Sequence, residues 1–428
     1  MKSRLASIFK KSEILQNTSI LVSGTIVAQA IPILLQPFLR RYFSPHDFGI
    51  YSVYSSLIGI LLVISSFRYE QAIVLPKRNR DASVLVTSSI LFSFVFSSLL
   101  FFAIILFRRG IRGLLNLDDP DGFILYLIPI GVFLLSVFQA FNFWLIRQKG
   151  FIKISVNKLV RRIVEGGSQS AAAIIHYPKG LVLGDVTGQV GNAITSAYQA
   201  VKCGYSPRHF SIVRSKYLLT RYSDFPRYSL VPALCSTIGF LLPVVLINRF
   251  YLPEQAGFFD LAKLILSVPM ALIATSISGV VLQKVSESYR LGKSFVDELK
   301  PLAAIVFIIS VAEVLLIALA GKGIFRVFFG KNWETSGIIS QLLVWPFALN
   351  FITSSFTSIF VALNRIRWQS LWQMVYFLLI ISLPLFKNFT FNGFIRIYAS
   401  IEIVASLAMV VLLIIVVVGY EKKLKMKG

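Results

Sequence analysis

The sequence predicts an all-α polytopic membrane protein, with twelve transmembrane helices in two pseudo-symmetric lobes of six. Hydrophobic residues make up 56% of the 428 positions, and charged residues only 14%. A soluble domain carries about a quarter charged residues, so this chain belongs in a bilayer. Mean hydropathy is +0.75, twelve apolar runs are each long enough to span a membrane, and one short pattern occurs twice, 208 positions apart.

The repeated pattern reads RYFSPHDFGIY from Arg41 to Tyr51 and RFYLPEQAGFF from Arg249 to Phe259. In both copies an apolar run ends at Arg, a Pro opens a turn, and a Gly precedes an aromatic residue by two positions. Pro suits the first turn of a helix, and a small residue lets two helices approach closely. We predict a membrane helical hairpin built twice; the alternative is chance similarity between two ordinary turns.

The expected spans follow the apolar runs, each of about 20 residues. The first is too long for a secretory signal and more spans follow it, so we expect it to remain as an uncleaved helix. The long segment 202–227 separates six spans from six, which predicts lobes at residues 1–210 and 211–428. The spans are predicted near 17–39, 48–66, 83–107, 123–146, 157–177, 181–201, 228–248, 257–281, 301–320, 336–362, 368–386 and 395–418.

Two of these spans are unusually polar. The first holds Gln29, Pro32, Gln36 and Pro37, which favours a kinked helix lining a cavity where loosened backbone can be satisfied. The fifth contains the stretch Glu165 to Ser170. That stretch is costly against lipid and is expected to face protein or water.

Basic residues predict the orientation. The chain has 43 Lys and Arg against 19 Asp and Glu, a net charge of +24. The gaps on the N-terminal side hold 30 of these basic residues and the opposite gaps hold 12, which places both termini in the cytoplasm. Because the basic residues lie mainly between apolar runs, they suit anionic lipid headgroups, and nucleic acid is not an expected partner.

Ionisable residues inside spans are the first candidates for function, because each is costly in a bilayer unless it is paired or hydrated. Asp260 and Lys263 share one helix face at spacing i, i+3. They are either substrate-binding residues or a neutralised pair within one helix. Arg68 and Glu70 lie where the second span ends; the guanidinium suits a lipid pyrophosphate, or it is a topological anchor with a local ion pair.

Six further residues complete the candidate sites. Arg41 and Arg249 are related by the repeat and either receive an anionic headgroup or snorkel to the surface. Four isolated acids are candidates for proton or cation coupling: Glu165, Asp185, Glu313 and Glu402. Asp185 has an alternative explanation, since glycines at 180, 184, 188 and 191 favour close packing of its helix on a neighbour.

Catalytic constellations are absent from the sequence. It contains no GxxxxGK[ST] loop, no HExxH motif, and three scattered histidines with two cysteines. The longest predicted outer segment has 15 residues, at 108–122, far below the size of a soluble catalytic domain. We therefore expect no catalytic residue, no metal site and no bound cofactor, and a transporter instead of an enzyme.

Four stretches carry a family resemblance: Ser23 to Pro32, Tyr42 to Tyr51, Arg68 to Pro76, and Phe328 to Glu334. They resemble the polysaccharide or O-antigen flippases (Wzx type) of the multidrug/oligosaccharidyl-lipid/polysaccharide (MOP) exporter superfamily. The match is specific over the first three helices and beyond them rests on helix count and the duplicated plan.

The resemblance implies a MATE-like fold in a bacterial inner membrane, with two lobes around a central cavity. It implies export of undecaprenyl-pyrophosphate-linked repeat units to the outer leaflet by alternating access, for O-antigen, capsule or exopolysaccharide assembly. It also implies proton or sodium coupling, contact with membrane lipids, and a glycan polymerase and chain-length regulator as partners. Related drug exporters commonly use an acid in helix one, and residues 17–39 hold none, so that cation site is not carried over.

Two other functions compete. A cation-coupled multidrug exporter fits the same fold, but the missing acid in helix one disfavours it. A membrane glycan polymerase or ligase is expected to have a large outer loop with paired Arg or His groups, and the short outer segments disfavour it. Arg68 and Lys263 are the residues most expected to bind the pyrophosphate.

Overall fold

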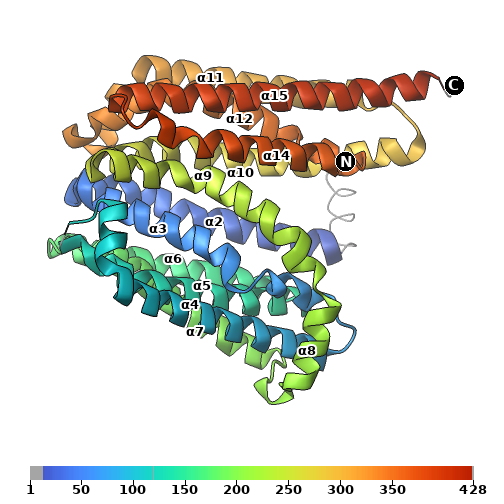
Figure 1. Ribbon diagram of the computed structural model, residues 1–428. Helices are drawn as coiled ribbons and strands as arrows, with labels where there is room; N and C mark the ends of the chain where they lie inside the picture. Colours follow the sequence, from blue (N-terminus) through green and yellow to red (C-terminus); the bar gives the residue numbers. More distant parts are fainter. Residues whose placement is uncertain (1–12, 119, 427–428) are drawn as a thin grey trace. The chain divides into compact units, whose positions relative to one another are not determined.

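The computed structural model describes residues 13–118 and 120–426, and their side chains from 27 onwards except those of 120 and 425. Part of the stretch Ser23 to Pro32 therefore has no described side chains. Helices make up nearly all of the described chain (Figure 1). The α-helices are α2 (Glu13–Tyr42), α3 (Pro45–Ser65), α4 (Asn79–Leu115), α5 (Ile124–Arg147), α6 (Phe151–Ile174), α7 (Gly180–Lys202), α8 (Ile212–Arg221), α9 (Leu230–Phe250), α10 (Pro253–Leu291), α11 (Val296–Phe329), α12 (Glu334–Phe356), α13 (Ser358–Ala362), α14 (Ile366–Ile381) and α15 (Phe391–Lys425).

Within the described residues, nine helical segments are long and apolar enough to cross a membrane. The protein is thus an all-helical, multi-pass membrane protein. Each of the twelve predicted spans overlaps a helix, but α2, α6 and α7 are not among the nine. The polar residues of α6 and the glycines of α7 reduce their apolar character, and the count of twelve in two six-helix lobes stays a prediction.

The chain forms two compact units, Met1–Thr237 and Ile238–Gly428. The predicted linker contributes α8, which packs on α4 inside the first unit. The Arg214 guanidinium donates from Nε and Nη2 to the two carboxylate oxygens of Asp81, both at 2.8 Å. The predicted lobes at 1–210 and 211–428 stay a prediction, and the boundary between the compact units lies within α9.

Both copies of the repeated pattern fold as predicted, as a helix, a tight turn and a helix that begins at Pro. Pro45 begins α3 and Pro253 begins α10. In the first copy Asp47 accepts the Ser44 N–H at 2.8 Å, and in the second Gln255 accepts the Leu252 N–H at 3.2 Å. Each acceptor is the third residue of its helix, so the repeat also preserves an N-terminal cap.

Glycines allow α7 to pack closely on α6, which confirms the packing predicted from their spacing. A Cβ placed on Gly184 would lie 2.4 Å from the Gln169 side chain, and one on Gly188 would lie 2.7 Å from the Glu165 Cβ. These distances are far below van der Waals contact. The polar face of α6 is buried here, since Glu165 and Gln169 are 5% and 6% exposed, so it faces protein as expected.

Gly188→Ala is expected to destabilise the first unit by about 1–3 kcal/mol, because the added methyl overpacks this contact. It would also lie 3.0 Å from the Arg161 carbonyl, so backbone must move. Gly191→Ala is the matched control, since its Cβ would make an ordinary 3.5 Å contact with Val164. Thermal unfolding of the purified variants measures both; equal midpoints would contradict the close approach.

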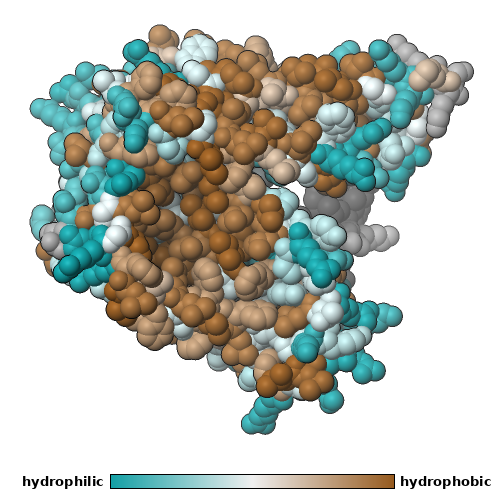
Figure 2. Space-filling view, viewed as in Figure 1, coloured by the Kyte–Doolittle hydropathy of each residue, from teal (hydrophilic) through white to brown (hydrophobic). Residues whose placement is uncertain are grey.

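The longest helices present apolar side chains outward. On the visible face, hydrophobic side chains cover the long helices and hydrophilic side chains gather near their ends (Figure 2). Helix α4 exposes Phe94, Leu99, Phe102 and Leu106, as expected for contact with lipid. At 37 residues α4 is longer than a span requires, and its backbone leaves helical geometry at Phe107, where the helix is kinked.

Candidate functional site

A cluster of opposite charges, with buried carboxylates and partly buried arginines, joins α6 and α7 in the first unit. Arg161 Nη2 lies 3.3 Å from Asp185 Oδ1, and Arg161 Nε lies 3.8 Å from Glu165 Oε2. Arg162 donates to Glu165 at 2.9 Å, and Gln189 donates to Asp185 at 2.5 Å. Two guanidinium groups thus balance the two carboxylates, which are 5% and 4% exposed.

Helix α3 covers this charge cluster with tyrosines. The Tyr51 hydroxyl donates to Glu165 Oε1 at 3.5 Å, and Tyr51 stacks on Tyr54 with ring centres 6.5 Å apart. Two of the predicted coupling acids, Glu165 and Asp185, are therefore brought together by the fold. Arginine already neutralises both, and their predicted coupling role stays a prediction.

In the second unit, Lys263 of α10 reaches the backbone of α9. Its ammonium donates to the Phe240 carbonyl and lies 3.5 Å from the centre of the Phe240 ring. Pro243 has no N–H to donate to the Gly239 carbonyl, four residues earlier in α9. The Tyr376 hydroxyl of α14 lies 3.3 Å from that carbonyl, so polar groups of other helices approach the α9 backbone near its proline.

The same Tyr376 hydroxyl lies 2.6 Å from Glu402 Oε1 on α15. Glu402 is 7% exposed and Lys263 is 6% exposed, and the two opposite charges interact electrostatically. Side chains from α10, α14 and α15 therefore meet at the Pro243 segment of α9. Asp260, half-buried one turn before Lys263, also interacts electrostatically with the ammonium.

Within the second unit, Glu313 of α11 is separate from the cluster of Lys263 and Glu402. It is 8% exposed, and its Oε2 has no hydrogen-bond partner among the described residues. Within this unit the structure does not bring Glu313 to Glu402, the other predicted coupling acid. A buried polar atom without a partner is costly, which keeps Glu313 a candidate for proton or cation coupling.

Arg68 lies in the turn between α3 and the 3₁₀ helix η1 (Tyr69–Val74), and Glu70 lies in the first turn of η1. Phe67 and Arg68 both have a left-handed backbone conformation, with φ of 52° and 65°. This conformation is strained for residues other than glycine. The Ser66 hydroxyl donates to Glu70, and burial raises the pKa of that carboxyl while this bond opposes the rise. Arg68 Nε is buried without a partner among the described residues.

Arg41 and Arg249 are exposed near the ends of α2 and α9. The buried guanidinium at the first site belongs instead to Arg40, which is 2% exposed. It donates from Nε to Gln36 at 2.8 Å and lies 3.8 Å above the Phe48 ring. Arg40 and Gln36 are four residues apart in the sequence, and this spacing indicates that their side chains can meet on one face of a helix.

The sequence reasoning missed three further residues, Arg161, Arg162 and Tyr376. Both arginines fall at the start of the predicted span 157–177, lie within α6 and bind carboxylates. Their i, i+4 and i, i+3 spacings to Glu165 would have revealed them. Within the described residues, no group of three His, Cys, Asp or Glu side chains is placed to hold a metal ion.

Solved membrane transporters share this fold. An inward-facing multidrug resistance MATE family transporter of the MOP superfamily aligns with a TM-score of 0.72 at 12% identity, over 93% of this chain and 99% of its own. The lipid II flippase MurJ, in an inward closed conformation, aligns with a TM-score of 0.74 at 12% identity, over 95% and 91%. The Vibrio cholerae MATE transporter VcmN gives 0.56 at 13% identity, over 96% of each.

At these identities the likeness establishes the fold alone, which is that of MATE and MurJ in the MOP superfamily. No curated protein matches the sequence. The family model described as "Polysaccharide biosynthesis protein" matches residues 14–282, more than half of the chain, and includes α2 and α3, where the sequence resemblance was most specific. The chain therefore belongs to the polysaccharide biosynthesis protein family.

Proposed function

We propose that this chain is a flippase for lipid-linked oligosaccharides. It would move undecaprenyl-pyrophosphate-linked repeat units from the cytoplasmic to the outer leaflet of a bacterial inner membrane by alternating access. The units would serve O-antigen, capsule or exopolysaccharide assembly. The main support is the membership of a polysaccharide biosynthesis family together with a fold similar to that of a lipid II flippase.

The residues available to this function fall into three groups. Arg68 offers an incompletely satisfied guanidinium at the end of α3, suited to one phosphate of the lipid head. Lys263 and Glu402 hold opposite charges beside the proline of α9, and Glu313 is the isolated acid. We assign ion coupling to the acids as part of the same proposal, with a proton or sodium gradient as the energy source and both termini in the cytoplasm.

The test is charge reversal of Arg68 in cells whose surface glycan depends on this chain. Arg68→Glu is expected to reduce surface glycan at least tenfold, because repulsion replaces a bidentate contact worth about 1.5–3 kcal/mol. The measurement is glycan at the cell surface, normalised to the amount of inserted protein.

Lys149→Glu is the matched control. Lys149 also has left-handed backbone, with φ of 54°, and its side chain is exposed. It follows α5 on the same predicted side of the membrane. Normal glycan in a stably expressed Arg68→Glu variant would remove Arg68 from the proposed substrate site.

A second candidate function is export of amphipathic drugs, which the MATE-like fold favours. The predicted span 17–39 lacks the acid that related drug exporters commonly carry. Altered drug tolerance after deletion of the gene, with surface glycan intact, would favour this function. Loss of glycan with unchanged drug tolerance would favour the flippase.

A further inference from the structure

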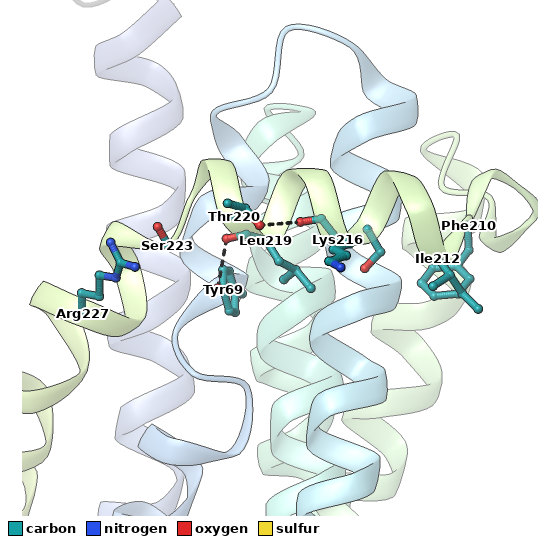
Figure 3. A pocket seen from close by; sticks show the side chains of 9 residues that line it. Tyr69, Phe210, Ile212, Lys216, Leu219, Thr220, Ser223 and Arg227 are labelled. Carbon is teal, nitrogen blue, oxygen red and sulfur yellow. Dashed lines mark hydrogen bonds between the residues drawn. The ribbon is translucent and has the colours of Figure 1, made fainter.

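A pocket of about 410 Å³ opens between η1, α8 and the short π-helix η4 (Phe225–Ser229) in the first unit. Tyr69 forms part of its wall, and its hydroxyl donates to the Leu219 carbonyl at 3.1 Å. This bond fixes η1 against α8, and the Thr220 hydroxyl donates back to the Lys216 carbonyl at 3.0 Å (Figure 3). The pocket is distinct from the two charge clusters described above.

Two cations line the pocket, Lys216 and Arg227, and no carboxylate is among its lining residues. In Figure 3 they lie on opposite sides of Tyr69. Arg227 acts on Tyr69 electrostatically: burial raises the pKa of the tyrosine hydroxyl, and the nearby positive charge opposes that rise. Asp81, which packs against α8, is bound by Arg214 through two hydrogen bonds. Asp224 follows the lining residue Ser223 in the chain but does not itself line the pocket, so the lining carries two positive charges and no negative one.

The chain connectivity places this pocket at the level of lipid headgroups. Tyr69 follows the span Pro45–Ser65 by four residues, and Arg227 lies in the first turn of the span Phe225–Phe250. Both span ends lie on the side where basic residues are concentrated, which the loop charges predict to be cytoplasmic. That leaflet carries the anionic phospholipids that attract basic segments.

The remaining walls are suited to a lipid instead of a soluble ion. Phe210, Ile212 and Leu219 line one part of the pocket. On α8, Ile212 and Val213 are 78% and 81% exposed, in a helix that also carries Arg214, Lys216 and Arg221. A helix with exposed apolar and basic residues lies well in a membrane interface.

We propose that this pocket binds the phosphate group of an anionic membrane phospholipid, with Lys216 and Arg227 as its charge partners. The apolar wall accommodates the glycerol end of the acyl chains, and α8 lies in the headgroup region. The bound lipid links α8 to η1 and to the start of α9. This site does not depend on the identity of the transported substrate.

Native mass spectrometry of the purified full chain tests the proposal, with phosphatidylglycerol and phosphatidylcholine titrated separately. The variant Lys216→Gln/Arg227→Gln is expected to bind phosphatidylglycerol at least tenfold more weakly, since each basic contact contributes about 1 kcal/mol. Binding of phosphatidylcholine is expected to stay unchanged. Both side chains are exposed, and Arg227→Gln alone, expected to lose several-fold, serves as the milder variant.

Lys293→Gln/Arg365→Gln is the matched control, because it removes the same two charges from exposed positions on the same predicted side of the membrane. It is expected to bind phosphatidylglycerol within twofold of the unmodified chain. Equal losses in the two double variants would overturn the pocket, since attraction would then follow net charge.

Two competitors distinguish the sources of phosphate. Glycerol 1-phosphate is expected to compete poorly; competition as strong as that of phosphatidylglycerol would overturn the lipid assignment in favour of a soluble phosphate. Undecaprenyl pyrophosphate is also expected to compete poorly. If it displaces phosphatidylglycerol at lower concentration, the phospholipid assignment fails and the pocket belongs to the transported class of lipid.

Discussion

Arg161→Ala is expected to destabilise the first unit by about 3–5 kcal/mol, the usual cost of removing one partner from a buried ion pair. The guanidinium lies 3.3 Å from Asp185 and 3.8 Å from Glu165. Asp185 is 4% exposed beside Arg161, and without the guanidinium its remaining hydrogen-bond donor is the neutral Gln189. Unfolding of the purified variant, followed with increasing denaturant or temperature, measures the loss.

Arg162→Ala is the internal control, because Arg162 contacts Glu165 alone within this cluster and Glu165 would keep Arg161. Its cost is expected to be about half as large or less. The double variant Arg161→Met/Asp185→Leu is expected to recover much of the stability, since replacing both members of a buried pair by apolar residues is often neutral. An Arg161→Ala variant as stable as Arg162→Ala would show that the contact with Asp185 contributes little.

Local features of the fold could be predicted from the sequence because their causes are local. Pro45 and Pro253 each fix the first turn of a helix, and every predicted span overlaps a helix because apolar runs of that length have few alternatives in a bilayer. The close packing of α7 on α6 was also predictable. Glycine has no side chain to hold two helices apart, so its spacing in the sequence indicates the close contact directly.

The partners of the buried charges could not be predicted in the same way. Asp185 and Arg161 lie on different helices, and their contact depends on how far each helix is rotated about its axis. Lys263 illustrates this further: its spacing from Asp260 predicts a partner on the same helix, and the two charges do interact, but its ammonium also donates to a backbone carbonyl on α9. The spacing of residues within one helix does not indicate which group on a neighbouring helix a side chain will contact.

Lys263→Met is the second change with a large expected effect, about 3–5 kcal/mol of lost stability in the second unit. The substitution keeps most of the side-chain volume and removes the charge. It leaves the Phe240 carbonyl without the ammonium and Glu402, 7% exposed, without its nearby positive charge. If the proposed flippase function is right, surface glycan falls at least tenfold, because α9 loses a contact that supports its proline segment.

Lys322→Met is the matched control for this change. Its side chain is 56% exposed and lies 3.5 Å from Glu334, and a surface pair of this kind contributes about 0–1 kcal/mol. The double variant Lys263→Met/Glu402→Gln is expected to regain part of the stability, because a neutral amide still accepts the Tyr376 hydroxyl without a buried charge. Unfolding midpoints that agree between Lys263→Met and Lys322→Met would mean that the ammonium of Lys263 does not hold α9, and that α9 is supported by packing and by Tyr376 instead.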